Sequence, residues 1–285
     1  MDEQEVRTRL AGQRFGDVRV VEETGSTNAD VLALARAGAR EGVVLVADHQ
    51  TAGRGRLERR WEAPPRASLL VSVLTRPVTG PLRLPVDAMH RVATALGVAA
   101  VEAARSVTGV PVRLKWPNDL IVEGPVVEGP VVEGPAVTGR ATRKVSGILA
   151  ETDLEHGTVA ALVVGIGINV NWPTALPAEL AEIATALNLE AGQSVDRAEL
   201  LVALLERFGH WYDVLGEADG AAQLLAAYRS HSATLGRRVR VELPTETIEG
   251  DAYDLTVDGH LLVIDECPDR PREITVGDVV HLRPT

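Results

Sequence analysis

The sequence has 285 residues, 45% of them hydrophobic, which is enough for one sizeable globular domain and a smaller one. The formal net charge of −11 argues against nucleic-acid binding, because neutralising phosphates requires a basic surface. A single cysteine, Cys267, excludes an internal disulfide and fits a reducing compartment. No apolar run approaches the ~20 residues of a membrane span, and the amino terminus lacks a signal-peptide core. We therefore expect a cytoplasmic protein without a membrane partner.

The first predicted elements are a strand at Val18 to Glu22 and a helix that Ser26-Thr27-Asn28 would cap. A buried strand, Val43 to Asp48, then leads into a polar loop, His49 to Glu62, with four arginines. The pattern next predicts a strand, a long helix, two short strands and two further strands, at Ala67 to Leu74, Val86 to Ser106, Val112 to Trp116, Leu120 to Val122, Ser146 to Thr152 and Thr158 to Ile166.

Helical patterns at Glu179 to Leu187, Asp196 to Leu215 and Ala218 to Ser230 are expected to cover one face of this sheet. From Gly236 the pattern changes to short strands with turns, which predicts a small β-barrel. Those strands are expected at Arg238 to Leu243, Thr247 to Leu255, His260 to Ile264 and Val276 to Leu282. The prediction is an α+β main domain over residues 1–235 and a small domain over 236–285.

A pentad array, Val-Val-Glu-Gly-Pro, occupies the chain between Val122 and Pro135. Proline at every fifth residue prevents both a helix and a central strand. We interpret residues 122–140 as an expanded, exposed hairpin loop without a catalytic role, and a charged site for a partner is the alternative.

The loop from Gln50 to Trp61 concentrates arginines on a backbone that its glycines allow to close over an anion. Its residues of interest are Gln50, Gly53, Arg54, Gly55, Arg56, Arg59 and Trp61. Phosphate or carboxylate would suit it, whereas taken alone an arginine-rich loop is more often a solvated surface. The glycine spacing is not that of a Walker motif.

The chain has only two lysines, Lys115 and Lys144, among 29 basic residues. Lys115 opens Lys-Trp-Pro-Asn-Asp, which could hold a nucleotide and its metal or could simply be a capped turn. Lys144 stands at the entrance of a strand, where its ammonium could steady a carboxylate that becomes a mixed anhydride, although such a lysine is usually solvated. The glycines of Gly165-Ile-Gly167-Ile-Asn169 would let a flat ligand lie against the backbone. The seven histidines show no metal-ligand spacing.

The order of these motifs resembles the biotin protein ligase family over roughly residues 18 to 285. The motifs are Ser-Thr-Asn, Gln…Gly-Arg-Gly-Arg…Arg-x-Trp, Lys-Trp-Pro-Asn-Asp, Lys-x-x-Gly-Ile-Leu and Gly-x-Gly-Ile-Asn. The resemblance implies a mixed sheet flanked by helices with an SH3-like tail. It implies an enzyme that adenylates biotin with ATP and Mg²⁺ and transfers it to a lysine of a biotin carboxyl carrier protein or domain. About seventeen residues precede the first strand, too few for the DNA-binding module of the repressor type. We expect the monofunctional type, without DNA as a partner, and a weak homodimer is possible by sheet pairing.

The resemblance also implies roles for individual residues. Biotin would contact Ser26, Thr27, Asn28, Gln50, Gly53, Arg54, Gly55, Arg56, Lys144 and Gly147. ATP and the adenylate would contact Arg59, Trp61, Lys115, Asn118 and Asn169. The chemistry would depend on Arg56, Lys115, Asp119 and Lys144, with Asp119 matching the carboxylate that would receive the acceptor lysine. The metal ligands stay open.

Two alternatives remain at this point. A lipoate or octanoate ligase or transferase would share the fold but prefer a long acyl tunnel. A non-catalytic biotin-sensing regulator belongs to a different class of protein, and the acidic balance and the short amino terminus argue against it.

Overall fold

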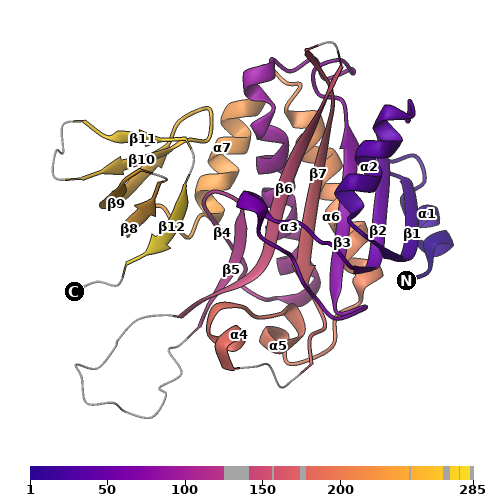
Figure 1. Ribbon diagram of the computed structural model, residues 1–285, viewed down its shortest axis with the longest axis horizontal. Coiled ribbons are helices and arrows are strands. Elements are labelled where there is room, and N and C mark those ends of the chain that lie inside the picture. The colour runs from indigo at the N-terminus through magenta and orange to yellow at the C-terminus, as the bar shows by residue number, and fades with distance from the viewer. Residues whose placement is uncertain are drawn as a thin grey trace.

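The computed structural model describes residues 1–124, 141–155, 157–173, 178–243, 245–265, 270–275 and 277–282. Its centre is a seven-stranded sheet in the order β1-β2-β3-β7-β6-β5-β4 (Figure 1). The strands are β1 (Asp17–Thr24), β2 (Val43–Gln50), β3 (Ser68–Thr75), β4 (Arg113–Lys115), β5 (Asp119–Gly124), β6 (Ala141–Glu155) and β7 (Thr158–Asn169). β1 and β2 are parallel and the other neighbours are antiparallel. The predicted mixed sheet is therefore confirmed.

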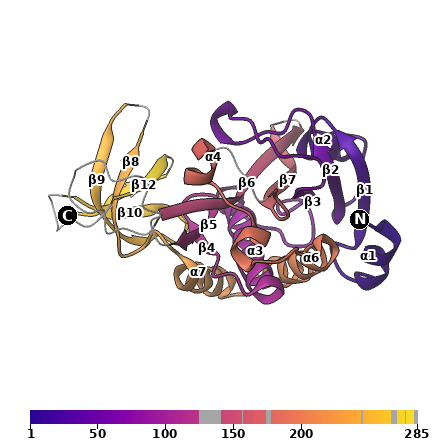
Figure 2. The same cartoon turned by 90° about the horizontal axis from the view of Figure 1, so that it is seen from below.

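Helices cover the two faces of this sheet unequally (Figure 2). On one face lies α3 (His90–Thr108), with α6 (Arg197–Val214) and α7 (Gly220–His231) packed against it. On the opposite face α2 (Thr27–Arg36) packs on β2, β3 and β7. The remaining helices are α1 (Glu3–Arg9), α4 (Ala178–Ile183), which contacts β6, and α5 (Leu187–Ala191), with short 3₁₀ turns η1 (Arg56–Glu58) and η2 (Val86–Ala88). Among the described residues the α2 face therefore has the sparser helical cover.

The alternation of β3 explains how one sheet supports both faces. Leu69, Val71 and Val73 belong to the large core under α3, whereas Leu74 belongs to the smaller core under α2. Because successive side chains of a strand point to opposite faces, Ser72 shares the α2 face with Leu74. A buried hydroxyl therefore faces the sparsely covered side of the sheet.

The last five strands form a separate antiparallel sheet, the C-terminal sheet, in the order β11-β10-β9-β8-β12 (Figure 1). They are β8 (Arg238–Glu242), β9 (Thr247–Leu255), β10 (Leu261–Ile264), β11 (Arg272–Ile274) and β12 (Asp278–His281). Within the residues described, the pairing does not close into a ring. Arg229 of α7 meets Asp254 of β9 through two hydrogen bonds of 2.7 and 2.8 Å, and Trp116 Nε1 donates to the Gly259 carbonyl at 2.9 Å. These contacts join the two sheets.

Several predicted elements differ in the structure. The helix α1 was not predicted; Asp2 caps it and its buried side chains are few, which gives a weak pattern. The helix expected over Glu179 to Leu187 is divided into α4 and α5, because Thr185 between them donates its backbone N–H to the Lys144 carbonyl at 2.9 Å. The strand β11 was also missed. Within the described part of the chain, no helix is long and apolar enough to span a membrane.

The predicted loop over residues 122–140 begins too early. Residues Val122 to Gly124 lie in β5, and Gly124 pairs with Ala141 of β6, so the pentad array connects two antiparallel neighbours. Residues 125–140 fall outside the described residues.

Candidate active site

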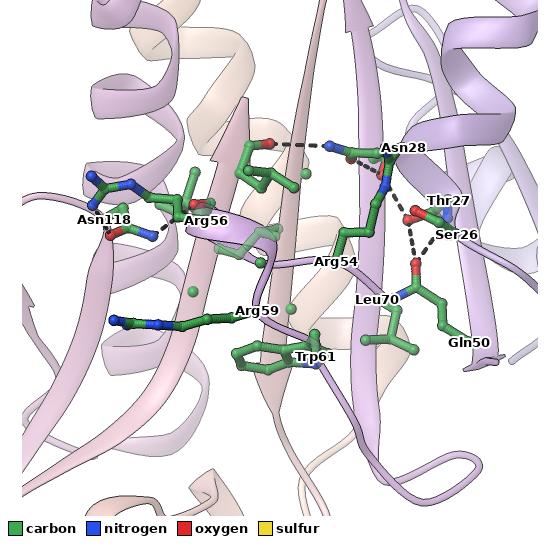
Figure 3. Close-up of a pocket in the computed structure, with 18 of the residues that line it drawn as sticks. Ser26, Thr27, Asn28, Gln50, Arg54, Arg56, Arg59, Trp61, Leu70 and Asn118 are labelled. Carbon is green, nitrogen blue, oxygen red and sulfur yellow. Dashed lines mark hydrogen bonds between the residues drawn. The ribbon is translucent and has the colours of Figure 1, made fainter. Parts of the chain in front are cut away.

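A pocket of about 140 Å³ lies on the α2 face, above β3, β7 and β6 (Figure 3). The amino terminus of α2 forms one end of the pocket, and the loop that follows β2 covers the pocket. Thirteen sequence-predicted residues line it: Ser26, Thr27, Asn28, Gln50, Arg54, Gly55, Arg56, Arg59, Trp61, Asn118, Asp119, Lys144 and Gly147. The fold thus brings together motifs that are separated by more than a hundred residues in the sequence.

At one end of the pocket, a side chain from the strand β2 caps the first turn of the helix α2. The Oε1 atom of Gln50 accepts hydrogen bonds from the Thr27 backbone N–H at 2.8 Å and from Thr27 Oγ1 at 2.9 Å. Ser26 occupies the N-cap position, but its side chain makes no capping hydrogen bond. Gln50 therefore makes the capping hydrogen bond that the sequence predicted for the Ser-Thr-Asn run. The Ser26 hydroxyl is left to face the pocket.

Around Asn28 a buried network extends this end of the pocket. Ser72 Oγ donates to Asn28 Oδ1 at 2.5 Å and lies 2.7 Å from Thr27 Oγ1. Asn28 Nδ2 donates to Glu151 Oε2 at 2.8 Å and to the Leu149 carbonyl at 3.3 Å. We call Thr27, Asn28, Gln50, Ser72 and Glu151 the hydroxyl–amide cluster. Since buried networks of satisfied polar groups rigidify a site, this end is preformed.

Gly165 is essential to the same network. A Cβ atom at this position would lie 2.1 Å from Asn28 Oδ1, closer than any real contact. The absence of a side chain in the middle of β7 therefore makes room for Asn28.

At the other end, the loop of residues 51–61, which we call the arginine loop, folds back on itself. Gly55 N donates to the Arg59 carbonyl at 2.7 Å, and Trp61 N donates to the Gly53 carbonyl at 3.0 Å. A Cβ atom at Gly53 would lie 2.4 Å from the Trp61 oxygen, so only glycine permits this turn. Gly53 therefore shapes the loop but does not line the pocket.

Each arginine that the sequence singled out in this loop has a polar partner. Arg54 Nη1 lies 3.0 Å from Glu151 Oε1, and Arg56 Nη1 donates to Asn118 Oδ1 at 2.9 Å. Arg59 forms an ion pair with Asp278 of the C-terminal sheet. These guanidinium groups supply donors suited to carboxylate or phosphate, so the loop can bind an anionic ligand.

Both lysines of the chain lie in this region. Lys144 Nζ is 2.6 Å from Asp119 Oδ1 and 5.6 Å from the centre of the Trp61 ring. Lys115 pairs in register with Asp119 but stands outside the pocket lining. Burial lowers the pKa of Lys115; Asp119 opposes that shift, and the charge of Lys144 adds to it. Asp119 thus pairs with the Lys144 ammonium and acts electrostatically on Lys115, so positive charge is concentrated on this side.

The floor of the pocket consists partly of glycine backbone. A Cβ atom at Gly167 would lie 2.6 Å from Trp61 Cε2, and one at Gly147 would lie 3.2 Å from Trp61 Cζ3. The sequence predicts that a flat group can lie against this backbone, and here that group is the indole of Trp61. A pocket for a drug-sized molecule usually measures about 300–1,000 Å³, so two substrates require the indole or the loop to move.

Asn169, assigned to the adenine by resemblance, does not line the pocket. It is buried, and its Nδ2 donates to the Thr185 carbonyl at 3.0 Å. In this structure it braces the segment between α4 and α5.

Sequence reasoning missed Ser72, Glu151 and Asp278. Ser72 carries a signal, because a hydroxyl in an otherwise apolar strand needs a partner. Glu151 and Asp278 carry none, since their partners lie far away in the sequence. Among the residues described, no group of three His, Cys, Asp or Glu could hold a metal ion. Any Mg²⁺ would have to be held largely by phosphate oxygens and water.

Comparisons with known proteins agree on one family. A model of the biotin/lipoate A/B protein ligase family matches residues 20–169, and a model of the biotin protein ligase C terminal domain matches residues 234–282. The biotin–[acetyl-CoA-carboxylase] ligase of Mycobacterium tuberculosis is 38% identical, covering 99% of this chain and 96% of that protein. The bifunctional ligase/repressor BirA of Bacillus subtilis is 30% identical, covering 92% and 74%. The structure of the Aquifex aeolicus biotin protein ligase with biotin and ATP has a TM-score of 0.73 and 29% identity, covering 94% and 99%.

Proposed function

This chain belongs to the biotin/lipoate A/B protein ligase family, and from that membership and its pocket we infer that it is a biotin protein ligase. It activates biotin with ATP to biotinyl-5′-AMP and transfers the biotin to a lysine of a biotin carboxyl carrier protein or domain. The observation that carries this function is the asymmetry of the pocket. A hydrogen-bonding end, whose one carboxylate Glu151 is paired with Arg54, suits the ureido ring of biotin, and a cationic end suits its carboxylate and the phosphates of ATP.

The roles of individual residues follow from their chemistry. We propose that Ser26, Thr27, Asn28 and Gln50 bind the ureido ring, that Gly55 and Gly147 leave space for the bound biotin, and that Gly53 acts on biotin indirectly by permitting the turn of the loop. Arg54, Arg56 and Lys144 would hold the carboxylate. Arg59, Trp61, Lys115 and Asn118 would contact ATP. Asn169 would act on the nucleotide only indirectly, because its amide is engaged with Thr185.

The reaction has two steps. A carboxylate oxygen of biotin attacks the α-phosphorus of MgATP, the α,β-bridging bond breaks, and pyrophosphate leaves. The lysine amine of the carrier then attacks the acyl carbon, and AMP leaves with the bonding electrons. Preorganised cations stabilise the charge that builds up on both anions in the first step. Mg²⁺ supplies charge neutralisation of the triphosphate when it is bound with ATP.

The pair between Lys144 and Asp119 suggests how the second step is prepared. At 2.6 Å each group neutralises the other in the free enzyme. When the biotin carboxylate takes Lys144 as its partner, Asp119 is released and can accept the proton that the carrier lysine must lose. One exchange thus prepares the cation and the base.

Partners and location complete the proposal. We divide the chain at residues 235/236 and place the enzyme in the cytoplasm, with a carrier of a biotin-dependent carboxylase as its protein substrate and no DNA partner. We propose a weak homodimer through β6, because within the described part of the chain residues 150–155 have β7 as their single strand partner. Sedimentation velocity over a concentration series tests it.

Biotin-dependent exchange of labelled pyrophosphate into ATP tests the enzymatic function. With Mg²⁺ present, biotin should support exchange, whereas lipoate and octanoate in parallel reactions should not. Exchange with lipoate or octanoate alone would assign the chain to the other branch of the family. No exchange with any of the three acids would point to a non-catalytic biotin-binding regulator.

A further inference from the structure

The C-terminal sheet reaches the pocket through one side chain. Among the described residues that line the pocket, Asp278 is the single one that this sheet contributes. Asp278 is the first residue of β12, and its carboxylate pairs with the guanidinium of Arg59 in the arginine loop. In Figure 3 the side chain of Arg59 extends away from Trp61 and Arg54, out of the centre of the pocket.

Arg59 is well placed to control the loop as a whole. Its carbonyl accepts the hydrogen bond from Gly55 N at 2.7 Å, and its own N–H donates to the Arg56 carbonyl at 3.2 Å. The backbone of Arg59 therefore closes the turn that carries Arg56. A contact that fixes the Arg59 side chain fixes this turn, whereas a free Arg59 leaves it held by backbone bonds alone.

Asp278 also acts on the neighbouring lysine. Burial lowers the pKa of Lys115, and the charge of Asp278 opposes that shift together with Asp119. Asp278 thus pairs with one cation that we assign to ATP, on the loop, and acts electrostatically on a second at the end of β4.

We propose that Asp278 is a positioning residue for ATP, through which the C-terminal sheet holds the arginine loop closed by its pair with Arg59. The proposal rests on the proposed ligase function and adds a residue that the motif analysis did not assign. The pair is partly exposed, with side-chain exposures of 66% for Arg59 and 29% for Asp278, so its contribution is modest. It acts on the binding of ATP and the retention of the adenylate more than on the chemical step.

The test compares Asp278→Asn with two other variants. Asp278→Glu keeps the charge. Asp254→Asn is the matched control, because it breaks the pair with Arg229 that also joins the C-terminal sheet to the main domain, but away from the pocket. We expect Asp278→Asn to raise the KM for ATP about fivefold, or ~1 kcal/mol, with kcat changed less than twofold. Asp278→Glu should recover most of that affinity, and Asp254→Asn should match the parent.

A second measurement does not depend on catalysis. Trypsin cleaves after arginine, so the rate at which the ligand-free enzyme is cut at Arg54, Arg56 and Arg59 reports how firmly the loop is closed. Cleavage of these bonds, identified by mass spectrometry, should be about fivefold faster in Asp278→Asn than in the parent or Asp254→Asn.

The outcomes separate the two proposals. If Asp278→Asn and Asp254→Asn behave alike in both measurements, Asp278 has no positioning role. A lower KM for ATP in Asp278→Asn would also overturn the proposal, because Asp278 would then compete with the triphosphate for Arg59. If the parent shows no biotin-dependent exchange, the ligase function fails, while the trypsin comparison still decides whether Asp278 closes the loop.

Discussion

The hydroxyl–amide cluster is centred on buried side chains joined by short hydrogen bonds, whereas the arginine loop carries exposed side chains held by single partners. Thr27 and Asn28 are each 4% exposed. The side chains of Arg54 and Arg59 are 43% and 66% exposed. An exposed ion pair contributes only about 0–1 kcal/mol, so an incoming anion can displace Glu151 from Arg54 with little loss. A buried network that loses a partner leaves unsatisfied groups, which costs about 1–3 kcal/mol.

This difference assigns the two ends different tasks. The cluster offers a fixed set of donors and acceptors before any ligand arrives, which is what discrimination between a ureido ring and an acyl chain requires. The loop offers charges that change partners during the reaction, since Arg54 and Arg56 can leave Glu151 and Asn118 for the ligand while Arg59 keeps Asp278. Specificity is therefore built into the rigid end, and closure over the adenylate is built into the adaptable end.

The largest effect is expected from Lys144→Ala, which removes the cation nearest to Asp119. The adenylation rate should fall about 100- to 1,000-fold, the range for losing one preorganised group that stabilises transition-state charge. Single-turnover formation of biotinyl-5′-AMP measures it. The control Arg240→Ala removes a cation from the C-terminal sheet and should leave the rate within twofold. A Lys144→Ala enzyme of normal rate would show that the cationic end has been misplaced.

The rigid end is tested by Gly165→Ala. The added Cβ would meet Asn28 Oδ1 at 2.1 Å and push the amide out of its network, so the Kd for biotin should rise about 30-fold, or ~2 kcal/mol. Isothermal titration calorimetry measures this Kd. Gly209→Ala in α6 is a suitable control, because the nearest atom to its Cβ is Phe15 Cδ2 at 3.9 Å. Equal affinities in the two variants would mean that the cluster is not the rigid half of the site.

The adaptable end is tested by Arg56→Ala. Without the bond to Asn118 the loop should close less well, so bound biotinyl-5′-AMP should escape about tenfold faster, while the Kd for biotin changes less. A chase with unlabelled biotin and ATP follows the release. If escape stays slow and biotin binding weakens instead, the division of tasks between the two ends is wrong.

The smallest effect is expected from acid, which should lower the free energy of unfolding through His281 of the C-terminal sheet. Burial, together with Lys115, Arg237 and Arg113, lowers the pKa of His281 from 6.5 to about 4. The unfolded protein then binds this proton more readily than the folded protein does. The contribution of His281 to the free energy of unfolding is therefore fully present above pH 6.5 and is lost as the pH falls toward 4. We expect a loss of about 1 kcal/mol after allowing for solvent screening. Urea unfolding at pH 7 and pH 4.5 measures this loss. The free energy of unfolding should fall less between the two pH values in His281→Gln than in the parent.

The sequence predicted the elements whose signals are local. The helix α6 begins after Asp196, whose side chain caps it, and that boundary could be read from the capping residue and the apolar spacing. The mixed sheet, the SH3-like tail and the family are confirmed by the structure and the comparisons. The motifs meet at one pocket because each lies on or directly beside a strand of the same sheet.

What the sequence could not predict depends on contacts between distant segments. Gln50 caps α2 from β2, and Glu151 serves both Asn28 and Arg54, so the partner of each group is fixed by the fold and not by the neighbouring residues. The division between α4 and α5 has the same origin, since Thr185 joins the backbone of β6. The indole of Trp61 over Gly167 was likewise invisible, because nothing in the local pattern shows which flat group takes that space.

The two lysines give this enzyme an unusual chemical surface. Apart from the amino-terminal amine, the chain offers an amine-selective acylating reagent only Lys115 and Lys144. Both lysines lie at or beside the pocket. The intact mass of the protein after brief acylation therefore counts free site amines directly. Bound adenylate should shield Lys144, so each missing acyl group would report an occupied site without a label, an antibody or a carrier protein.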